Sequence, residues 1–178
     1  MYTPKIARQL RCVAFLAVVI SPASNAQTVQ LGEPISEAEL SEFDLIVSPD
    51  GSGLPAGNGS VKDGQVVFET KCAACHGLSG EGVSGNTVLV GGDMHSAENP
   101  LKTVGSYWPY ATTVFDFIRR AMPANAPKSL SNDEVYQVTA YVLYLNGIIS
   151  ESTALDKASL SQIKMPNKDG FIDLSHLH

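Results

Sequence analysis

The chain has 178 residues, of which 44% are apolar and 17% charged. This composition is typical of one globular domain and excludes a generally disordered chain. Its 12 Lys and Arg against 18 Asp and Glu give a formal net charge of −6, which argues against nucleic acid or an anionic membrane surface as a partner. Three cysteines are too few for a disulfide-stabilised scaffold.

Residues 1–26 have the pattern of a secretory signal peptide. Three basic residues precede nine apolar residues at 12–20, and small residues lead to Ala26. We expect cleavage after Ala26 and export to the periplasm. Nine apolar residues are too few to cross a bilayer, which takes roughly 20, so no membrane span is expected after cleavage. Removal of the signal would take the net charge from −6 to −9 and leave Cys72 and Cys75 as the cysteines of the mature chain.

Residues 27–60 are predicted to form an N-terminal extension. Ser36 and Glu39 fit a capping box for a short helix that runs towards Glu42. The following run, 49–59, is rich in Gly, Pro, Asp and Ser and predicts turns. Composition leaves open whether this run is a flexible linker or an ordered loop.

The central segment, 61–147, is predicted to be an all-α domain. A first helix begins at Ser60 and runs into Cys72, and a second covers Tyr110–Ala121. In that second helix Asp116 lies four residues before Arg120, a spacing that supports a helix.

A third helix has the clearest signals. Ser131 and Glu134 form a capping box, and Asn146-Gly147 gives a stop signal. We expect a core of helices that spans about 62–147, followed by a C-terminal tail at 148–178 with a short helix near 158–164.

Cys72-Ala73-Ala74-Cys75-His76 is a C-x-x-C-H motif, which is typical of c-type haem attachment. Two thiols at this spacing lie on one helical turn and add to the two vinyl groups of a haem, while the next residue presents an imidazole to the iron. A structural zinc site needs four Cys or His ligands, and His95, His176 and His178 lack the paired spacing of such ligands. A plain disulfide stays open as an alternative, but it leaves the histidine without a role.

A haem iron held by His76 needs a sixth ligand or keeps an open site. Met122 follows the second predicted helix, 46 residues after His76, and thioether opposite imidazole favours electron transfer over oxygen chemistry. Its position between two helices favours Met122. Met94, His95 and Met165 are the rival candidates.

These residues resemble the class I cytochrome c family. Gly64 and Phe68 before the motif are similar to its N-terminal helix, Val138 and Tyr141 to the pair in its last helix that crosses that glycine, and Met122-Pro123 to its methionine ligand. The resemblance implies a class I cytochrome c fold with haem attached through Cys72 and Cys75. It also implies that His76 and Met122 are the axial ligands.

A narrower resemblance, to the cytochrome subunits of bacterial sulfite dehydrogenases and the related sulfane dehydrogenase, rests on residues 49–55, 105–113, 119–123 and 165–171. It implies a non-catalytic electron carrier that accepts electrons from a molybdopterin sulfite-oxidising subunit and passes them to a downstream cytochrome c or terminal oxidase. The single C-x-x-C-H motif implies one haem c, whereas the sulfane dehydrogenase cytochrome has a second haem domain.

Many class I members also have a proline near the haem whose carbonyl orients the proximal histidine. No proline occurs at 86–89, so a backbone carbonyl in 86–88 is the candidate in its place.

Two further groups carry alternative roles. Trp108 or Tyr107 is a candidate donor to a haem propionate, although packing is the commoner role of such aromatics. Arg119 and Arg120 are candidates to bind a propionate or a partner carboxylate, or are solvated surface residues. A free-standing electron shuttle and a haem-based sensor with an open coordination site are the alternative functions.

Overall fold

The computed structural model describes residues 32–83, 88–96, 100–172 and 174. The predicted signal peptide lies outside these residues. The chain divides into two units, 1–35 and 36–178, and the second contains the helices and strands described here. No helix in the described part of the chain is long and apolar enough to span a membrane. The elements, in chain order, are α1 Glu37–Phe43, β1 Asn58–Ser60, α2 Val61–Lys71, α3 Ala73–His76, α4 Ala111–Ala121, α5 Asn132–Leu145, β2 Ala154–Asp156 and α6 Lys157–Leu160.

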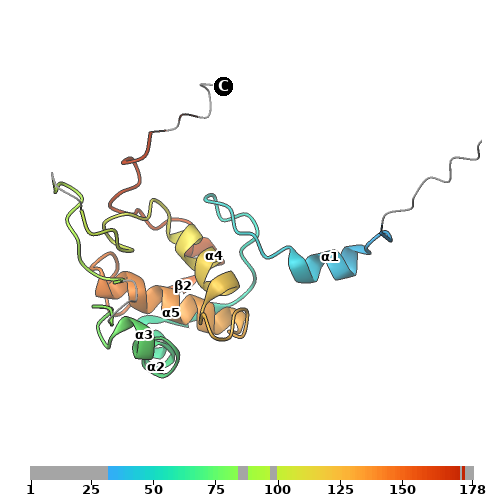
Figure 1. Cartoon of the computed structure of the whole chain (residues 1–178), viewed down its shortest axis with the longest axis horizontal. Coiled ribbons are helices and arrows are strands. Elements are labelled where there is room, and N and C mark those ends of the chain that lie inside the picture. The colour runs from blue at the N-terminus through green and yellow to red at the C-terminus, as the bar shows by residue number, and fades with distance from the viewer. Residues whose placement is uncertain (1–31, 84–87, 97–99, 173, 175–178) are drawn as a thin grey trace, which may run out of the picture. The chain divides into compact units, whose positions relative to one another are not determined.

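Helix α5 is the central element, and it packs against α2, α4 and the two strands (Figure 1). Its first turn is capped as predicted: the Ser131 hydroxyl accepts from Glu134 N at 3.2 Å, and the Glu134 carboxylate accepts from Ser131 N at 2.9 Å. Eight of its fourteen residues are buried. A helix covered on several sides in this way forms the centre of an α-helical domain.

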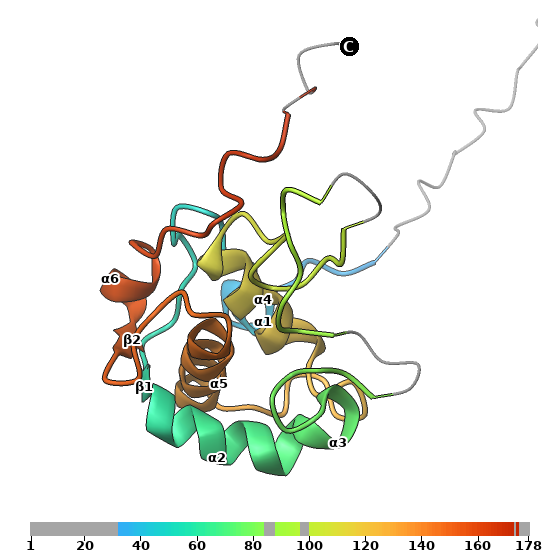
Figure 2. The same cartoon turned by 90° about the vertical axis from the view of Figure 1, so that its left-hand side faces the viewer.

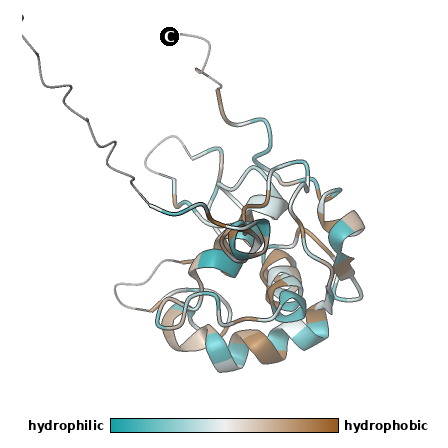
Figure 3. Cartoon of the chain, turned by 90° about the vertical axis from the view of Figure 1, so that its right-hand side faces the viewer, coloured by the Kyte–Doolittle hydropathy of each residue, from teal (hydrophilic) through white to brown (hydrophobic). Residues whose placement is uncertain are grey.

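Helix α2 crosses α5 at very short range. Gly64 lies so close to α5 that a Cβ atom built on it would be 1.9 Å from the carbonyl oxygen of Gln137. Val67 and Phe68 are buried on the same side of the helix, whereas Lys62 and Val66 are exposed. The ribbon of α2 accordingly changes between hydrophilic and hydrophobic residues along its length (Figure 3).

A two-stranded antiparallel sheet, which the sequence did not predict, joins the two ends of the helical domain. Strands β1 and β2 pair with Gly59 opposite Leu155, and Val61 N donates to Thr153 O at 3.2 Å (Figure 2). Each strand has only three residues and so shows no alternating pattern. The chain therefore enters and leaves the helical domain at the same place.

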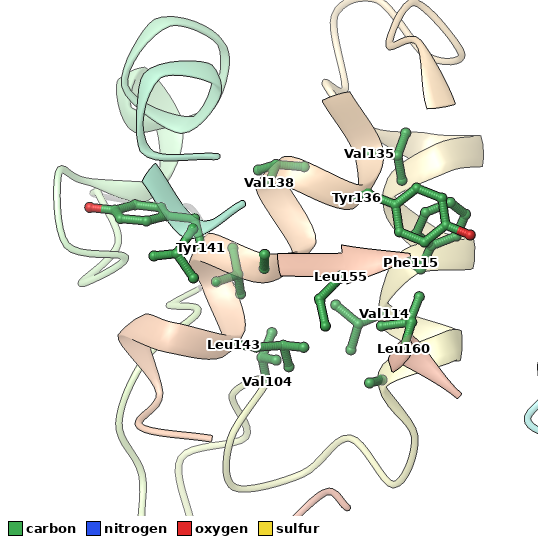
Figure 4. Close-up of a cluster of buried hydrophobic side chains, with 14 of the residues drawn as sticks. Val104, Val114, Phe115, Val135, Tyr136, Val138, Tyr141, Leu143, Leu155 and Leu160 are labelled. Atoms are coloured by element: carbon green, nitrogen blue, oxygen red, sulfur yellow. The ribbon is translucent and has the colours of Figure 1, made fainter. Parts of the chain in front are cut away.

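The buried core extends beyond the predicted limits of 62–147. The Phe115 and Tyr136 rings pack with centroids 4.5 Å apart, and Leu155 and Leu160 lie in the same cluster (Figure 4). Val47, Leu54 and Met165 are each 3% exposed and belong to it as well. The prediction of the core limits was wrong because the segments that carry these residues show no apolar periodicity.

Residues 49–57 form an ordered loop, which decides between the two alternatives left open by composition. The Tyr136 hydroxyl donates to Pro55 O at 2.9 Å, and the Thr112 hydroxyl donates to Pro49 O at 3.1 Å. Within the loop, Ser52 N donates to the Asp50 carboxylate at 2.8 Å. These bonds hold the loop against α4 and α5.

Candidate functional site

The C-x-x-C-H motif folds as one helical turn at the end of α2. Cys72 ends α2 and begins α3, and its carbonyl accepts from Cys75 N at 3.1 Å and from His76 N at 3.0 Å. The turn therefore holds the two cysteines and the histidine in a fixed local order.

The chain reverses directly after the motif. Gly77 has φ +78°, a left-handed conformation that favours glycine, and a Cβ there would collide with the Glu81 carboxylate. The carbonyl of His76 accepts from Gly82 N at 2.7 Å. Hydrogen bonds from the backbone N–H groups of Glu81 and Ser79 hold the pKa of the Glu81 carboxyl below its usual value. This tight turn fixes the backbone of the histidine.

Cys72 and Cys75, the two cysteines of the described residues, are free thiols. Burial raises the pKa of the Cys72 thiol to about 11, because the charged thiolate loses its hydration. Cys75 is exposed. Within the described ranges, no three His, Cys, Asp or Glu side chains form a group that could hold a metal ion. Cys72 and Cys75 are therefore not joined by a disulfide, and the described residues form no zinc site; His176 and His178 lie outside them.

The motif lines a cavity of about 780 Å³, which lies within the usual size range of cofactor pockets. Cys72, Cys75 and His76 line it from the end of α2 and from α3, and Met122 and Pro123 line it from the end of α4. Apolar and aromatic side chains supply most of the remaining wall: Phe68, Val88, Leu89, Val104, Trp108, Val114, Phe117, Ile118, Leu130, Val138 and Val142.

Met122 is the one predicted ligand candidate in the described residues that shares this cavity with the motif. It caps the C-terminus of α4, where its N–H donates to Ile118 O at 3.0 Å. Met94 lines a separate pocket of about 430 Å³, and Met165 is buried in the core at 3% exposure. His95 is exposed and lines neither pocket.

The two aromatic candidates have different positions. Trp108 lines the cavity and packs edge-to-face on Phe117, with centroids 5.7 Å apart. Tyr107 does not line it and packs instead on Phe171 of the tail at 5.2 Å. Of the pair, Trp108 is therefore placed to contact a bound cofactor.

Arg119 and Arg120 bind groups of this chain and do not line the cavity. Arg120 forms a bidentate ion pair with Asp116, with a closest distance of 2.5 Å, which raises the pKa of its guanidinium. Arg119 donates to Leu45 O at 3.2 Å. The same Asp116 side chain is buried, with 8% of its surface exposed, and its carboxylate also accepts from Val47 N at 2.9 Å. Sequence spacing indicated the contact with Arg120 but not the one with Val47, 69 residues away.

Thr103 is a further residue of the cavity wall that sequence reasoning missed. It is buried, its hydroxyl donates to Gly91 O, and its N–H donates to the Ser106 hydroxyl at 3.0 Å. No sequence signal identifies it. Of the residues proposed to orient the proximal histidine, 86 and 87 lie outside the described part of the chain, and Val88 lines the cavity.

The donor set and the wall together fit a haem. Two thiols and an imidazole on one turn match covalent attachment with one axial ligand, and a thioether borders the same apolar cavity. When bound, a haem supplies one-electron redox chemistry. The apolar side chains of the cavity exclude water from it and provide a surrounding of low polarity, which tunes the reduction potential.

Comparisons with known proteins agree with this geometry. The cytochrome c family model matches residues 61–146. A solved structure, the sulfane dehydrogenase SoxCD from Paracoccus pantotrophus, contains a chain that is similar at 39% identity with a TM-score of 0.78, over 85% of this chain and 75% of that one. No match was found among the curated proteins. The family implies covalently bound haem c, and the chain belongs to the cytochrome c family of electron-transfer proteins.

Proposed function

We propose that this protein is a periplasmic monohaem cytochrome that accepts electrons from a molybdopterin-containing subunit that oxidises sulfite or a related sulfur compound. A downstream cytochrome c or terminal oxidase then receives the electrons. The chain itself performs no sulfur chemistry in this proposal, and the export signal at residues 1–26 supports the compartment.

The observation that carries the proposal is the extent of the similarity to SoxCD. The match covers 85% of the chain, whereas residues 61–146 make up less than half of it. Similarity therefore includes segments outside the haem-binding domain. The flanks are also part of the fold, since Val47, Leu54 and Met165 contribute to the core. A general electron shuttle has no need for these additional segments.

The residues would act as follows. Cys72 and Cys75 would form the thioether bonds to haem c, and His76 and Met122 would be the axial ligands. Trp108 has an indole N–H in the cavity wall and would donate it to a propionate. Exposed Cys75 borders the cavity, as do four exposed residues of the following loop: Ala124, Asn125, Ala126 and Ser129. This edge is therefore where electrons would enter and leave.

The test uses tagged full-length protein in native periplasm without oxygen. We expect added sulfite to reduce the c-type haem spectrum in the periplasm, but not in the purified protein. The sulfite-oxidising subunit should copurify with the tagged chain. A Cys72→Ala and Cys75→Ala double variant, which cannot attach haem, is the control for the spectroscopic signal.

Two results would contradict parts of the proposal, the first its choice of sulfite and the second its assignment of an electron carrier. If sulfite gives no reduction in periplasm while dithionite reduces the haem, then sulfite is excluded as the source of electrons. Other sulfur compounds or a general shuttle would then be tested. If the reduced protein binds carbon monoxide rapidly, the coordination site is open and the sensor alternative replaces the carrier.

A further inference from the structure

Helix α1 and the three residues after it form a short acidic segment with exposed apolar side chains, here called the acidic arm (residues 37–46). The arm contains four acidic residues and no Lys or Arg. Leu40, Phe43 and Ile46 are spaced three residues apart and are 44%, 67% and 63% exposed. Large apolar side chains grouped in this way on a surface mark an interaction site.

The base of the arm is fixed to the haem-binding domain. Val47, directly after the arm, is buried, and its N–H donates to the Asp116 carboxylate. Leu45 O accepts from Arg119, which lies on the same helix α4. The arm therefore ends at a well-anchored point, directly after helix α1.

The helix of the arm is also stabilised locally. The Ser36 hydroxyl accepts from Glu39 N at 3.3 Å, and the Glu39 carboxylate accepts from Ser36 N at 3.0 Å. The Ser36 hydroxyl also donates to the Glu39 carboxylate at 2.7 Å, and this bond and the one from Ser36 N lower the pKa of the Glu39 carboxyl. A capped helix that is already formed loses less conformational entropy on binding than a disordered peptide does.

The charges decide between possible occupants of this apolar surface. A second copy of the chain would bring two acidic arms together in a protein of net charge −6, which is unfavourable. An anionic lipid surface repels four carboxylates in the same way. A protein groove with an apolar floor and a rim of Lys or Arg is complementary to both features of the arm.

We propose that the acidic arm binds such a groove on the sulfur-oxidising subunit. This inference rests on the proposed function, and it identifies the part of the chain that recognises the partner. The arm would hold the two proteins together while the haem edge remains a separate contact.

The experiment compares two variants of the tagged full-length haem protein. A Phe43→Ser and Ile46→Ser double variant removes apolar surface from the arm. Val66→Ser is the matched control, because Val66 is an exposed apolar residue, 62% exposed, on helix α2. Each protein is used to capture the sulfur-oxidising subunit from the same periplasm, and sulfite-dependent haem reduction is followed.

We expect the double variant to capture at least fivefold less of that subunit and to be reduced at least fivefold more slowly. The control should behave as wild type. Both should keep the wild-type haem spectrum and dithionite reduction, which shows that the fold is intact. A second variant, Glu37→Lys with Glu39→Lys, should also weaken capture, and high salt should weaken capture by the wild type.

Equal capture and equal reduction rates for wild type and the double variant would overturn this inference alone. Failure of sulfite and of the related sulfur compounds to reduce the wild-type protein in periplasm would overturn the proposed function and this inference with it. Wild-type dimers in solution that the double variant loses, or binding of the wild type to anionic vesicles, would also overturn it, since the arm would then have another occupant.

Discussion

Replacement of Gly64 by alanine tests the close crossing of α2 and α5. The new Cβ would lie 1.9 Å from Gln137 O, whereas real Cβ atoms essentially never approach closer than 3.0 Å, so the two helix backbones must separate by about 1.1 Å. Alanine favours an isolated helix by about 1 kcal/mol over glycine. Overpacking costs about 1–3 kcal/mol and occasionally more, and backbone atoms on both sides leave little room for relaxation.

We therefore expect a net loss of about 2 kcal/mol in the free energy of unfolding, and a fall of about 4–8 °C in the melting temperature of the haem protein. Thermal unfolding followed by circular dichroism measures the change in melting temperature. Val66→Ala, on the exposed side of the same helix, is the control for helix propensity and should not destabilise. A Gly64→Ala variant as stable as wild type, or more stable, would refute the crossing geometry.

Three further predictions concern the ligand, the anchor of the extension and the pH dependence of stability. Met122→Ala should give a high-spin or ligand-exchanged iron with a lowered reduction potential, measured by absorption spectroscopy and redox titration; an unchanged low-spin spectrum and potential would exclude this ligand. Asp116→Ala should lower stability by about 1–3 kcal/mol, because a buried backbone N–H loses its acceptor, and Asp116→Asn, which keeps an acceptor, should lower it less. The Glu134 carboxyl lies 2.5 Å from Lys71 Nζ, and chiefly this hydrogen bond lowers its pKa. The contribution of the Glu134 carboxylate to stability is therefore fully present above pH 4.5, the ordinary pKa of the group. It is lost as the pH falls through the lower pKa of the folded protein. Denaturant melts of wild type and Glu134→Gln should therefore differ by up to about 1 kcal/mol at pH 7, and the difference should shrink as the pH falls below 4.5; a constant difference would show that the contribution is not ionic.

Local signals predicted the helices and the motif well. Ser60 and Ser131 are helix caps in the structure, and the C-x-x-C-H sequence forms the single turn that its chemistry requires. These features depend on residues within about four positions of one another, which a sequence displays directly. The place of Met122 at the cavity followed from its position between two helices.

Long-range contacts were not predictable from spacing. The pairing of Gly59 with Leu155 and the bond from Val47 N to Asp116 join segments that are far apart in the chain. Each depends on how the helices pack, and neither leaves a periodic pattern. The burial of Met165 has the same origin: as a lone methionine in a polar tail, it had the sequence features of a possible ligand and not of a core residue.

The small sheet gives the domain a modular character. It lies at one end of α2 and the C-x-x-C-H turn lies at the other, about 16 Å away for a helix of eleven residues (Figure 2). Both flanking segments join the helical domain at the sheet. Insertions, deletions or fused domains in these segments therefore begin at a distance from the groups that set the reduction potential. The flanking segments can therefore change in length or sequence without placing new residues beside the C-x-x-C-H turn.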